Sequence, residues 1–201
     1  MKTPALLDEL LRAGAPSGYE GPAAEVWRKA AGFADEQASD GIGSSIARVG
    51  SEAPLLAIVG HIDEIGLIVT HIDDDGFLYF TGVGGWDPQI LVGQRVELIT
   101  REGPVAGVLG KKPIHLLKPD DRKKVAEIKD LHIDIGAADG DEAKAKVRIG
   151  DVAVISGEPV ELPNGRVISR SMDNRLGAYV AYEAARLVAE AGGAPGDVAA
   201  V

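Results

Sequence analysis

Cysteine is absent from this 201-residue sequence. Disulfide bonds are therefore excluded, and so is a zinc site built from thiolates. A metal ion in this protein would have to be bound by histidine and carboxylate side chains. That ligand set is typical of catalytic rather than structural zinc.

Long apolar runs are also absent. No stretch of the sequence approaches the roughly 20 apolar residues that are needed to cross a bilayer. The first residues, Met-Lys-Thr-Pro, lead into Asp8 and Glu9, so they lack the apolar core of a secretory signal. We therefore expect a cytoplasmic protein with no membrane partner. Its length allows one large domain or two small ones.

Basic residues are in the minority: 21 Lys and Arg stand against 31 Asp and Glu, and the formal net charge is −10. Because nucleic-acid binding requires clustered positive charge, this balance argues against a nucleic-acid partner. The densest basic run, Arg122-Lys123-Lys124, follows two aspartates. It is typical of a solvated turn or the start of a helix.

The first part of the chain follows the pattern of an α/β domain. Thr3 and Pro4 predict the start of a first helix, and a second helix is expected over residues 22–31. Strands are expected between residues 34 and 59. The last of them is the apolar run at residues 55–59, which is typical of a buried strand in a parallel sheet.

From residue 67 onward the sequence consists of short β-rich segments separated by glycine and aspartate turns. Such regularly spaced short strands predict a small β-barrel or sandwich. We place this inserted β domain at residues 68–163, between two parts of the α/β domain at residues 1–67 and 164–201. The expected strands are residues 67–72, 77–81, 94–100, 105–109, 131–135 and 152–156.

The sequence then returns to an α/β pattern. Residues 166–169 predict a strand, residues 174–191 a helix, and residues 197–201 the start of another core strand. The side chains expected on the buried face of that helix are Leu176, Val180, Ala184 and Leu187.

A group of polar residues, His61, Asp63 and Glu64, follows the apolar run at residues 55–59 almost directly. Polar side chains at the carboxyl end of a strand lie where open α/β sheets bind ligands. His61 and Asp63 share a face because they are two residues apart in extended chain, whereas Glu64 points away. His61 is therefore a candidate metal ligand, with Asp63 orienting its imidazole. The triplet alone fits a structural histidine equally well.

Asp173 is a second candidate metal ligand. It lies where the strand at residues 166–169 meets the following helix, next to amides that can stabilise a carboxylate. A helix N-cap is the simpler interpretation, and Ser171 or Asn174 could also cap this helix. Taken alone, Asp173 is better explained by capping.

Several short motifs occur in a fixed order along nearly the whole chain. They are Pro16-Ser17-Gly18-x-Glu20, Gly60-His61-x-Asp63-Glu64-Ile65-Gly66, Gly84-Gly85-Trp86-Asp87, Gly93-Gln94-Arg95-Val96, Leu131-x-Ile133-Asp134-Ile135-Gly136-Ala137 and Met172-Asp173-Asn174-Arg175-x-Gly177. Each motif has little specificity alone, but the ordered set is specific. With these motifs the sequence resembles the tetrahedral aminopeptidases, a family of co-catalytic metallo-aminopeptidases that includes deblocking and glutamyl aminopeptidases.

The resemblance implies a phosphorylase/hydrolase-like α/β peptidase domain interrupted by a PDZ-like β-barrel. It also implies a homo-oligomer that removes N-terminal residues from peptides at a centre of two divalent metal ions, zinc or cobalt. His61 matches a ligand of one metal, and Asp63 matches the catalytic-site carboxylate that orients its imidazole. Asp173 matches the carboxylate that bridges both metals, and two cations about 3.5–4 Å apart need such an anion between them. Asn174 and Arg175 are expected to support this loop.

The resemblance further implies groups that this sequence does not contain. A Glu-Glu pair that supplies the general base and a metal ligand, and later an Asp and a His ligand, would lie beyond Val201. Catalytic zinc sites normally have three protein ligands, so we expect the 201-residue chain alone to be inactive and to bind metal weakly. The remaining histidines, His71, His115 and His132, match no ligand and are expected to be structural.

Two other functions were weighed against the resemblance. The β insertion could form a non-catalytic assembly or peptide-binding module, either by pairing with copies of itself or by adding peptide strands to its edge. A glycosidase that uses Asp63 and Glu64 is excluded. Neighbouring residues of a strand point to opposite faces, so these two carboxylates cannot flank one glycosidic bond.

Overall fold

In the computed structural model, residues 2–51 and 54–201 are described. The chain divides into two compact units: Met1–Glu64 with Gly157–Val201, here called the α/β unit, and Ile65–Ser156, the barrel unit. The sequence places the insertion at residues 68–163, so both of its boundaries differ from those of the structure. Strand β4 of the barrel already begins at Gly66, and the segment after Ser156 belongs to the α/β unit.

Two helices, α1 (Ala5–Arg12) and α2 (Gly21–Ala30), open the α/β unit. Leucines recur at helical spacing in α1 and give it one apolar face, so that Leu10 and Leu11 are fully buried. The residue that precedes the first turn is Pro4, whereas the backbone N–H of Thr3 donates to the Glu161 carboxylate.

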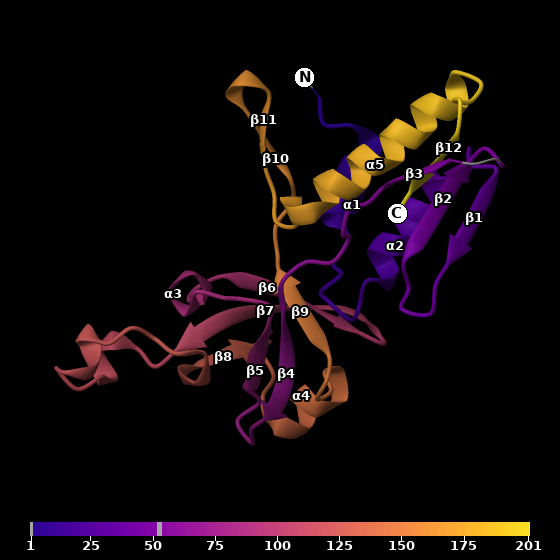
Figure 1. The fold of residues 1–201 in the computed structure, drawn as a ribbon. Helices are drawn as coiled ribbons and strands as arrows, with labels where there is room; N and C mark the ends of the chain where they lie inside the picture. Colours follow the sequence, from indigo (N-terminus) through magenta and orange to yellow (C-terminus); the bar gives the residue numbers. More distant parts are fainter. Residues whose placement is uncertain (1, 52–53) are drawn as a thin grey trace. The chain divides into compact units, whose positions relative to one another are not determined.

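Four strands form the sheet of the α/β unit, in the order β1-β2-β12-β3 (Figure 1). β12 (Asp197–Ala200) is antiparallel to β2 (Ser45–Val49) on one side and parallel to β3 (Leu55–Ile58) on the other. β1 (Glu36–Ser39) pairs with β2 as an antiparallel hairpin. Every residue of β12 is buried, which confirms the core strand predicted at the end of the sequence.

The strand predicted at residues 55–59 is present as β3 and pairs in parallel with β12, but the prediction that it is buried is wrong. β3 lies at the edge of the sheet, where it pairs with β12 among the described residues. Leu55 and Leu56 are 55% and 61% exposed. Their apolar character indicated burial, but among the described residues of the strand only Ile58 packs, partly buried, against the core of the α/β unit.

The helix α5 (Met172–Glu190) packs on the sheet through small residues. Ala178, Ala181 and Ala185 are buried in one core with Trp27 of α2 and with residues of β2 and β12. Alanines have short side chains, so the helix axis can approach the sheet closely.

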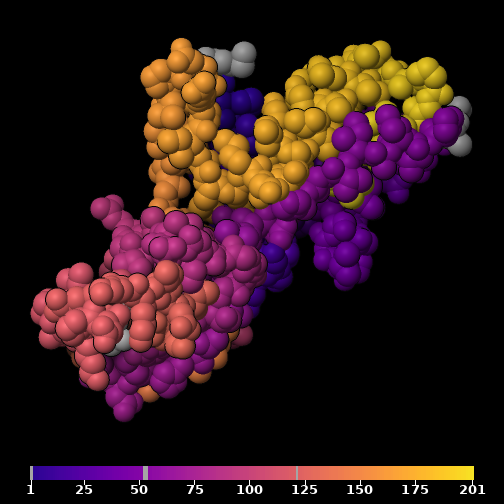
Figure 2. Space-filling view, turned by 60° about the vertical axis from the view of Figure 1, so that its left-hand side comes forward, coloured from indigo at the N-terminus to yellow at the C-terminus, as the bar shows by residue number. Residues whose placement is uncertain are grey.

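The predicted inward face of this helix is therefore wrong. Leu176, Val180 and Leu187 are 47%, 52% and 52% exposed, and they form a stripe on the side of α5 that faces away from the sheet. α5, drawn in gold, lies open along the surface in the space-filling view (Figure 2). Helical spacing identified the stripe correctly but could not tell which of the two faces is buried.

The barrel unit is built from six antiparallel strands that close in the order β4-β5-β8-β7-β6-β9. Their alternate side chains fill the interior, where Leu98, Leu131 and Ile133 are fully buried. Each predicted β segment overlaps one strand, so the predicted barrel is confirmed. The strands are β4 (Gly66–Ile72), β5 (Leu78–Val83), β6 (Arg95–Thr100), β7 (Gly103–Lys111), β8 (Leu131–Asp134) and β9 (Val152–Ile155).

Short helices connect the strands of the barrel unit. Asp87 and Asp139 cap two of them by accepting backbone N–H hydrogen bonds. The helical turns are α3 (Pro88–Leu91), α4 (Gly140–Lys146), and the 3₁₀ turns η1 (Ile114–Leu116), η2 (Asp121–Lys123) and η3 (Ile128–Asp130). None of the helices in the described part of the chain has both the length and the apolar character of a membrane span.

The strand predicted at residues 166–169 is present, but it does not join the main sheet. β11 (Arg166–Ile168) pairs with β10 (Val160–Leu162) in a separate two-stranded hairpin, with the 3₁₀ turn η4 (Pro163–Gly165) between them. Three residues, 169–171, connect this hairpin to α5, so the hairpin shortly precedes Asp173 in the chain.

Candidate functional site

The segment that carries His61 follows β3 and passes very close to the start of α5. A Cβ atom on Gly60 would lie 2.5 Å from the backbone nitrogen of Ala178. A Cβ on Gly177 would collide with the Asn174 side-chain oxygen. Gly60 therefore lets backbone approach backbone, which brings the His61 segment against the start of α5, and Gly177 leaves room for the Asn174 side chain.

The imidazole of His61 lies between two carboxylates. Its Nδ1 is 2.7 Å from Asp63 Oδ1, and its Nε2 is 3.1 Å from Asp173 Oδ1. Asp173 is 112 residues further along the chain than His61, so only the fold brings the two together. The three residues that the sequence singles out thus lie in one place, as neighbours within the α/β unit.

Asp63 has a second partner that the sequence did not reveal. The Ser17 hydroxyl donates to Asp63 Oδ2, while Asp63 Oδ1 faces His61. Burial acts to raise the pKa of Asp63, but the hydrogen bonds from Ser17 and His61 outweigh it, and the pKa lies below the ordinary value. Asp63 is therefore a carboxylate at neutral pH. Ser17 belongs to the first of the ordered motifs, which was the available signal, although its hydroxyl had no assigned role.

Asp173 does not act as the helix cap that it resembles in the sequence. The N-cap position of α5 is Ser171, whose hydroxyl donates to the carbonyl of Arg170. Asp173 itself has non-helical backbone angles, and its peptide bond to Asn174 is cis. Its side chain is largely exposed and turns toward His61. The carboxylate is thus available to a ligand, which a cap engaged with backbone amides would not be.

The donor atoms at this site fit part of a metal centre. Two ligands of one tetrahedral zinc ion lie about 3.3 Å apart, and His61 Nε2 and Asp173 Oδ1 are 3.1 Å apart. The hydrogen bond that His61 Nδ1–H donates to the Asp63 carboxylate is the support that metal-bound imidazoles usually have. Within the described residues, however, no group of three or more His, Cys, Asp or Glu side chains could hold a metal ion. The site therefore supplies two ligands.

A hollow of about 530 Å³ lies against the His61–Asp63 segment. It is lined on one side by Glu20, Trp27 and Arg28 around α2, and on another by the turn that joins β1 to β2. His61 and Asp63 form part of its wall. His61 is therefore open to a solute of the size of a few amino acid residues.

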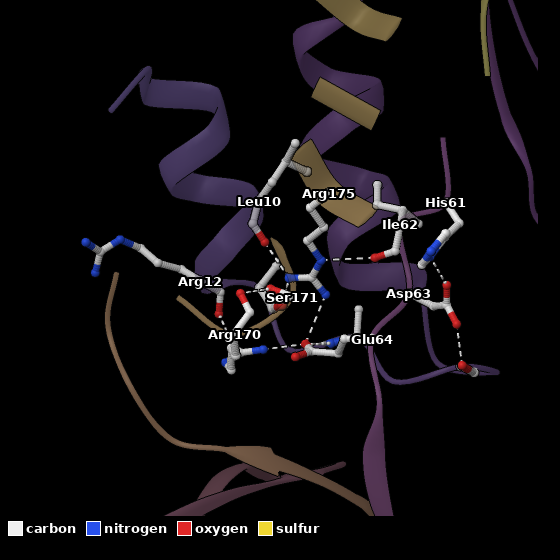
Figure 3. A network of polar contacts seen from close by, with 12 residues as sticks. Leu10, Arg12, His61, Ile62, Asp63, Glu64, Arg170, Ser171 and Arg175 are labelled. Carbon is white, nitrogen blue, oxygen red and sulfur yellow. Dashed lines mark hydrogen bonds and ion pairs between the residues drawn. The ribbon is translucent and has the colours of Figure 1, made fainter. Parts of the chain in front are cut away.

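Glu64 points away from the site into the interior of the α/β unit, as predicted for the residue after Asp63. It is buried and pairs with Arg170 and with Arg175, which is fully buried (Figure 3). Asp63 and Glu64 thus face different environments, which agrees with the exclusion of a glycosidase that would use both.

The other histidines lie within the barrel unit. His132 packs against Phe77, with ring centroids 4.6 Å apart, and His71 lies 5.9 Å from Tyr79. His115 is part of the 3₁₀ turn η1. Each of the first two has an aromatic neighbour that accounts for its position.

Comparison with known proteins gives consistent matches. Residues 43–201 match the family described as M42 glutamyl aminopeptidase. The chain is 33% identical over 159 residues to the lysyl aminopeptidase of Pyrococcus furiosus. The aligned region covers 78% of this chain and 46% of that protein.

Solved structures resemble the whole chain. A TET aminopeptidase from a marine-sediment thaumarchaeon has a TM-score of 0.93 and 38% identity, covering 97% of this chain and 56% of its own. The TET1 peptidase of Pyrococcus horikoshii, described as assembling into a tetrahedron or a large octahedral shell, has a TM-score of 0.85 and 36% identity, covering 96% of this chain and 58% of its own. The chain thus spans about half the length of these relatives.

Proposed function

The chain belongs to the M42 glutamyl aminopeptidase family, and on this basis we propose that it carries one part of a metal-dependent aminopeptidase site that removes N-terminal residues from peptides. The observation that supports the proposal most strongly is the position of His61 between Asp63 and Asp173. A structural histidine needs no second carboxylate supplied from 112 residues away. Two divalent ions, zinc or cobalt, are the cofactors that we propose.

His61 would bind a metal ion through Nε2, because Nδ1 is engaged by Asp63. Asp63 fixes the tautomer and the orientation of the ring, and Ser17 holds Asp63 in turn. Asp173 would bind through its carboxylate and, in the two-metal centre that we propose, would bridge the two ions. Bound divalent metal ions polarise a scissile carbonyl and lower the pKa of a bound water molecule. The substrate would enter from the hollow beside His61.

The 201-residue chain by itself is proposed to bind metal weakly and to lack peptidase activity. Two protein ligands are fewer than the three that catalytic zinc sites normally have. Among the described residues, the carboxylates within hydrogen-bonding distance of the His61 ring are those of Asp63 and Asp173. Tight stoichiometric zinc binding together with peptide hydrolysis by this chain would contradict the proposal.

A chimera tests the role of these residues in catalysis. Residues 43–201 of this chain would replace the matching part of the P. furiosus lysyl aminopeptidase, and release of N-terminal residues from short peptides would be measured with zinc or cobalt. The chimera should be active, and His61→Ala or Asp173→Asn should abolish the activity, whereas His132→Ala should leave it unchanged. A folded, active chimera that tolerates His61→Ala would refute the assignment.

We also propose that the protein forms a homo-oligomer. The support is its likeness, over 96% of the chain, to a peptidase described as assembling into a tetrahedron or a large octahedral shell. Size-exclusion chromatography with light scattering tests this. A discrete assembly without metal-dependent activity in any context would favour the alternative, a non-catalytic assembly or peptide-binding module.

A further inference from the structure

The buried carboxylate of Glu64 holds together three parts of the α/β unit. Its Oε1 atom accepts a hydrogen bond from the backbone N–H of Ala15 at 3.1 Å and from Arg175 Nη2 at 3.0 Å, and it also pairs with Arg170 Nη1. The Glu64 side chain is only 4% exposed. The α1–α2 loop and the side chains of Arg170 and Arg175 therefore meet at one oxygen atom at the end of the His61 segment (Figure 3).

Arg175 extends this junction to both of the segments that carry the candidate ligands. It lies two residues after Asp173, and its Nε donates to the carbonyl of Ile62, the residue after His61, at 3.0 Å. Its Nη1 donates to the carbonyls of Leu10 and Ala13 at the end of α1. The guanidinium thus satisfies carbonyls that a helix end leaves without partners. Because the guanidinium group of Arg175 is planar and rigid, its hydrogen bonds fix the distance between the His61 segment and the Asp173 loop.

The negative charge of Glu64 also allows the side chains of two arginines to lie close to one another in the interior of the α/β unit. Burial lowers the pKa of Arg175, the Glu64 carboxylate opposes this, and the positive charge of Arg170 adds to the lowering. Arg170 is itself mostly buried and donates from Nη2 to the Arg12 carbonyl at 2.8 Å. Without the negative charge, the two guanidinium groups would repel one another on either side of Asp173.

A buried ion pair is no efficient source of stability, because apolar residues of the same volume can stabilise a fold as well or better. What it supplies is a fixed geometry. Glu64 follows Asp63 in extended chain, so anchoring its side chain inward directs Asp63 outward toward His61 and Ser17. Motion of Glu64 would therefore change the distance between His61 Nε2 and Asp173 Oδ1.

We infer that Glu64 is a positioning residue: through Arg175 and Arg170 it sets the separation of His61 and Asp173 and thereby the metal affinity of the site. This inference rests on the proposed function for its metal readout. Glu64 itself is not proposed to touch a metal ion or a substrate, because the Glu64 carboxylate is engaged by Ala15, Arg170 and Arg175.

The test compares Glu64→Gln with Asp197→Asn in the 201-residue chain. Asp197 of β12 is a similarly buried carboxylate of the same unit, and its Oδ2 accepts a hydrogen bond from Arg48. Three quantities are measured for each variant: thermal unfolding, the ¹⁵N chemical shifts of the His61 ring without metal, and zinc affinity by calorimetry. Both variants should unfold at lower temperature.

Glu64→Gln should shift both ring nitrogens of His61 and weaken zinc binding by about 10-fold, the lower end of the loss that follows removal of a group bonded directly to a metal ligand. Asp197→Asn should change neither. Arg170→Gln removes one of the three donors to Glu64 Oε1. It should cause smaller changes of the same kind in the His61 ring shifts and in zinc affinity. This variant therefore tests the inference if Glu64→Gln does not fold.

Unaltered His61 shifts and zinc affinity in folded Glu64→Gln would overturn the inference and leave Glu64 with a purely structural role. Equal changes in Asp197→Asn would overturn it as well, because they would show a general effect of lower stability. If the unsubstituted chain binds no zinc, the proposed metal site fails, while the metal-free ring shifts still decide whether Glu64 positions His61.

Discussion

The barrel unit and the α/β unit hold their chains together in different ways. Of the twelve largest fully buried side chains in the described residues, nine belong to the barrel unit. The other three, Leu10, Leu11 and Arg175, belong to the α/β unit. A closed barrel pairs each strand on both sides and fills its interior, whereas the α/β sheet ends in β3 with Leu55 and Leu56 exposed.

The difference concerns function, because the candidate site lies in the unit with less apolar core. There the two site-bearing segments are joined by glycine contacts and by a buried arginine–glutamate network. In the barrel unit leucine packing determines the structure. In the α/β unit we expect single polar groups and single glycines to matter more than single leucines.

The same substitution in the two units should give the largest contrast. Leu131→Ala removes a fully buried side chain from the barrel interior and should cost about 2–5 kcal/mol of unfolding free energy. Leu56→Ala changes a side chain that is mostly exposed and should cost less than about 0.5 kcal/mol. Urea unfolding followed by circular dichroism measures both. Equal losses would show that β3 is covered in solution and would break the comparison.

Gly60→Ala should have the next largest effect. The added methyl would lie 2.5 Å from the backbone nitrogen of Ala178, so β3 and α5 must separate, at about 1–3 kcal/mol. His61 would also move away from Asp173. Gly32→Ala is the matched control, because nothing lies within 4 Å of its added methyl. Unchanged His61 ring shifts in Gly60→Ala would mean that this close contact does not set the site.

A polar residue in the exposed stripe of α5 should change stability little. Leu187→Gln should alter the unfolding free energy by less than about 0.5 kcal/mol. Because it removes exposed apolar surface, it should reduce binding of the dye ANS and any self-association. A large loss of stability would indicate that this face of α5 is buried in solution.

The smallest effect expected is that of Arg186→Ala on α5. Hydrogen bonding from Arg186 lowers the pKa of Glu183 below its ordinary value. Such a depressed pKa gives stability that is present above the unfolded-state pKa and is lost as the pH falls through the folded-state value. At pH 7 the variant should be only slightly less stable, because exposed helical ion pairs contribute little. The gap should close below about pH 4, and a gap that persists there would exclude Glu183 as its cause.

Much of the fold was predictable from the sequence because it depends on local patterns. The six barrel strands were found from β-rich segments and turns, and the central strand β12 from its apolar run. Predictions of burial failed where the burial of a segment depends on which other parts of the protein cover it. The run at residues 55–59 and the leucines of α5 are apolar, but the sequence could not show that they lie at an edge and on an outer face.

For the candidate site, the sequence identified the residues but not their surroundings. His61, Asp63 and Asp173 follow from motifs, and the structure places them together. The Ser17 hydroxyl and the Glu64 network could not be derived, because each depends on contacts between distant segments. Glu64 was predicted only to point away from the site. Its partners emerge only when the fold brings Arg170 and Arg175 to it.

The pairing of His61 with Asp173 as metal ligands is tested most directly by cobalt(II) titration, followed by its visible absorption. The unsubstituted chain should show weak, saturable binding, His61→Ala and Asp173→Asn should abolish it, and His132→Ala should bind as the unsubstituted chain does. His132 is the control because it packs against Phe77 in the barrel unit. Cobalt binding that survives His61→Ala unchanged would contradict the assignment of this site.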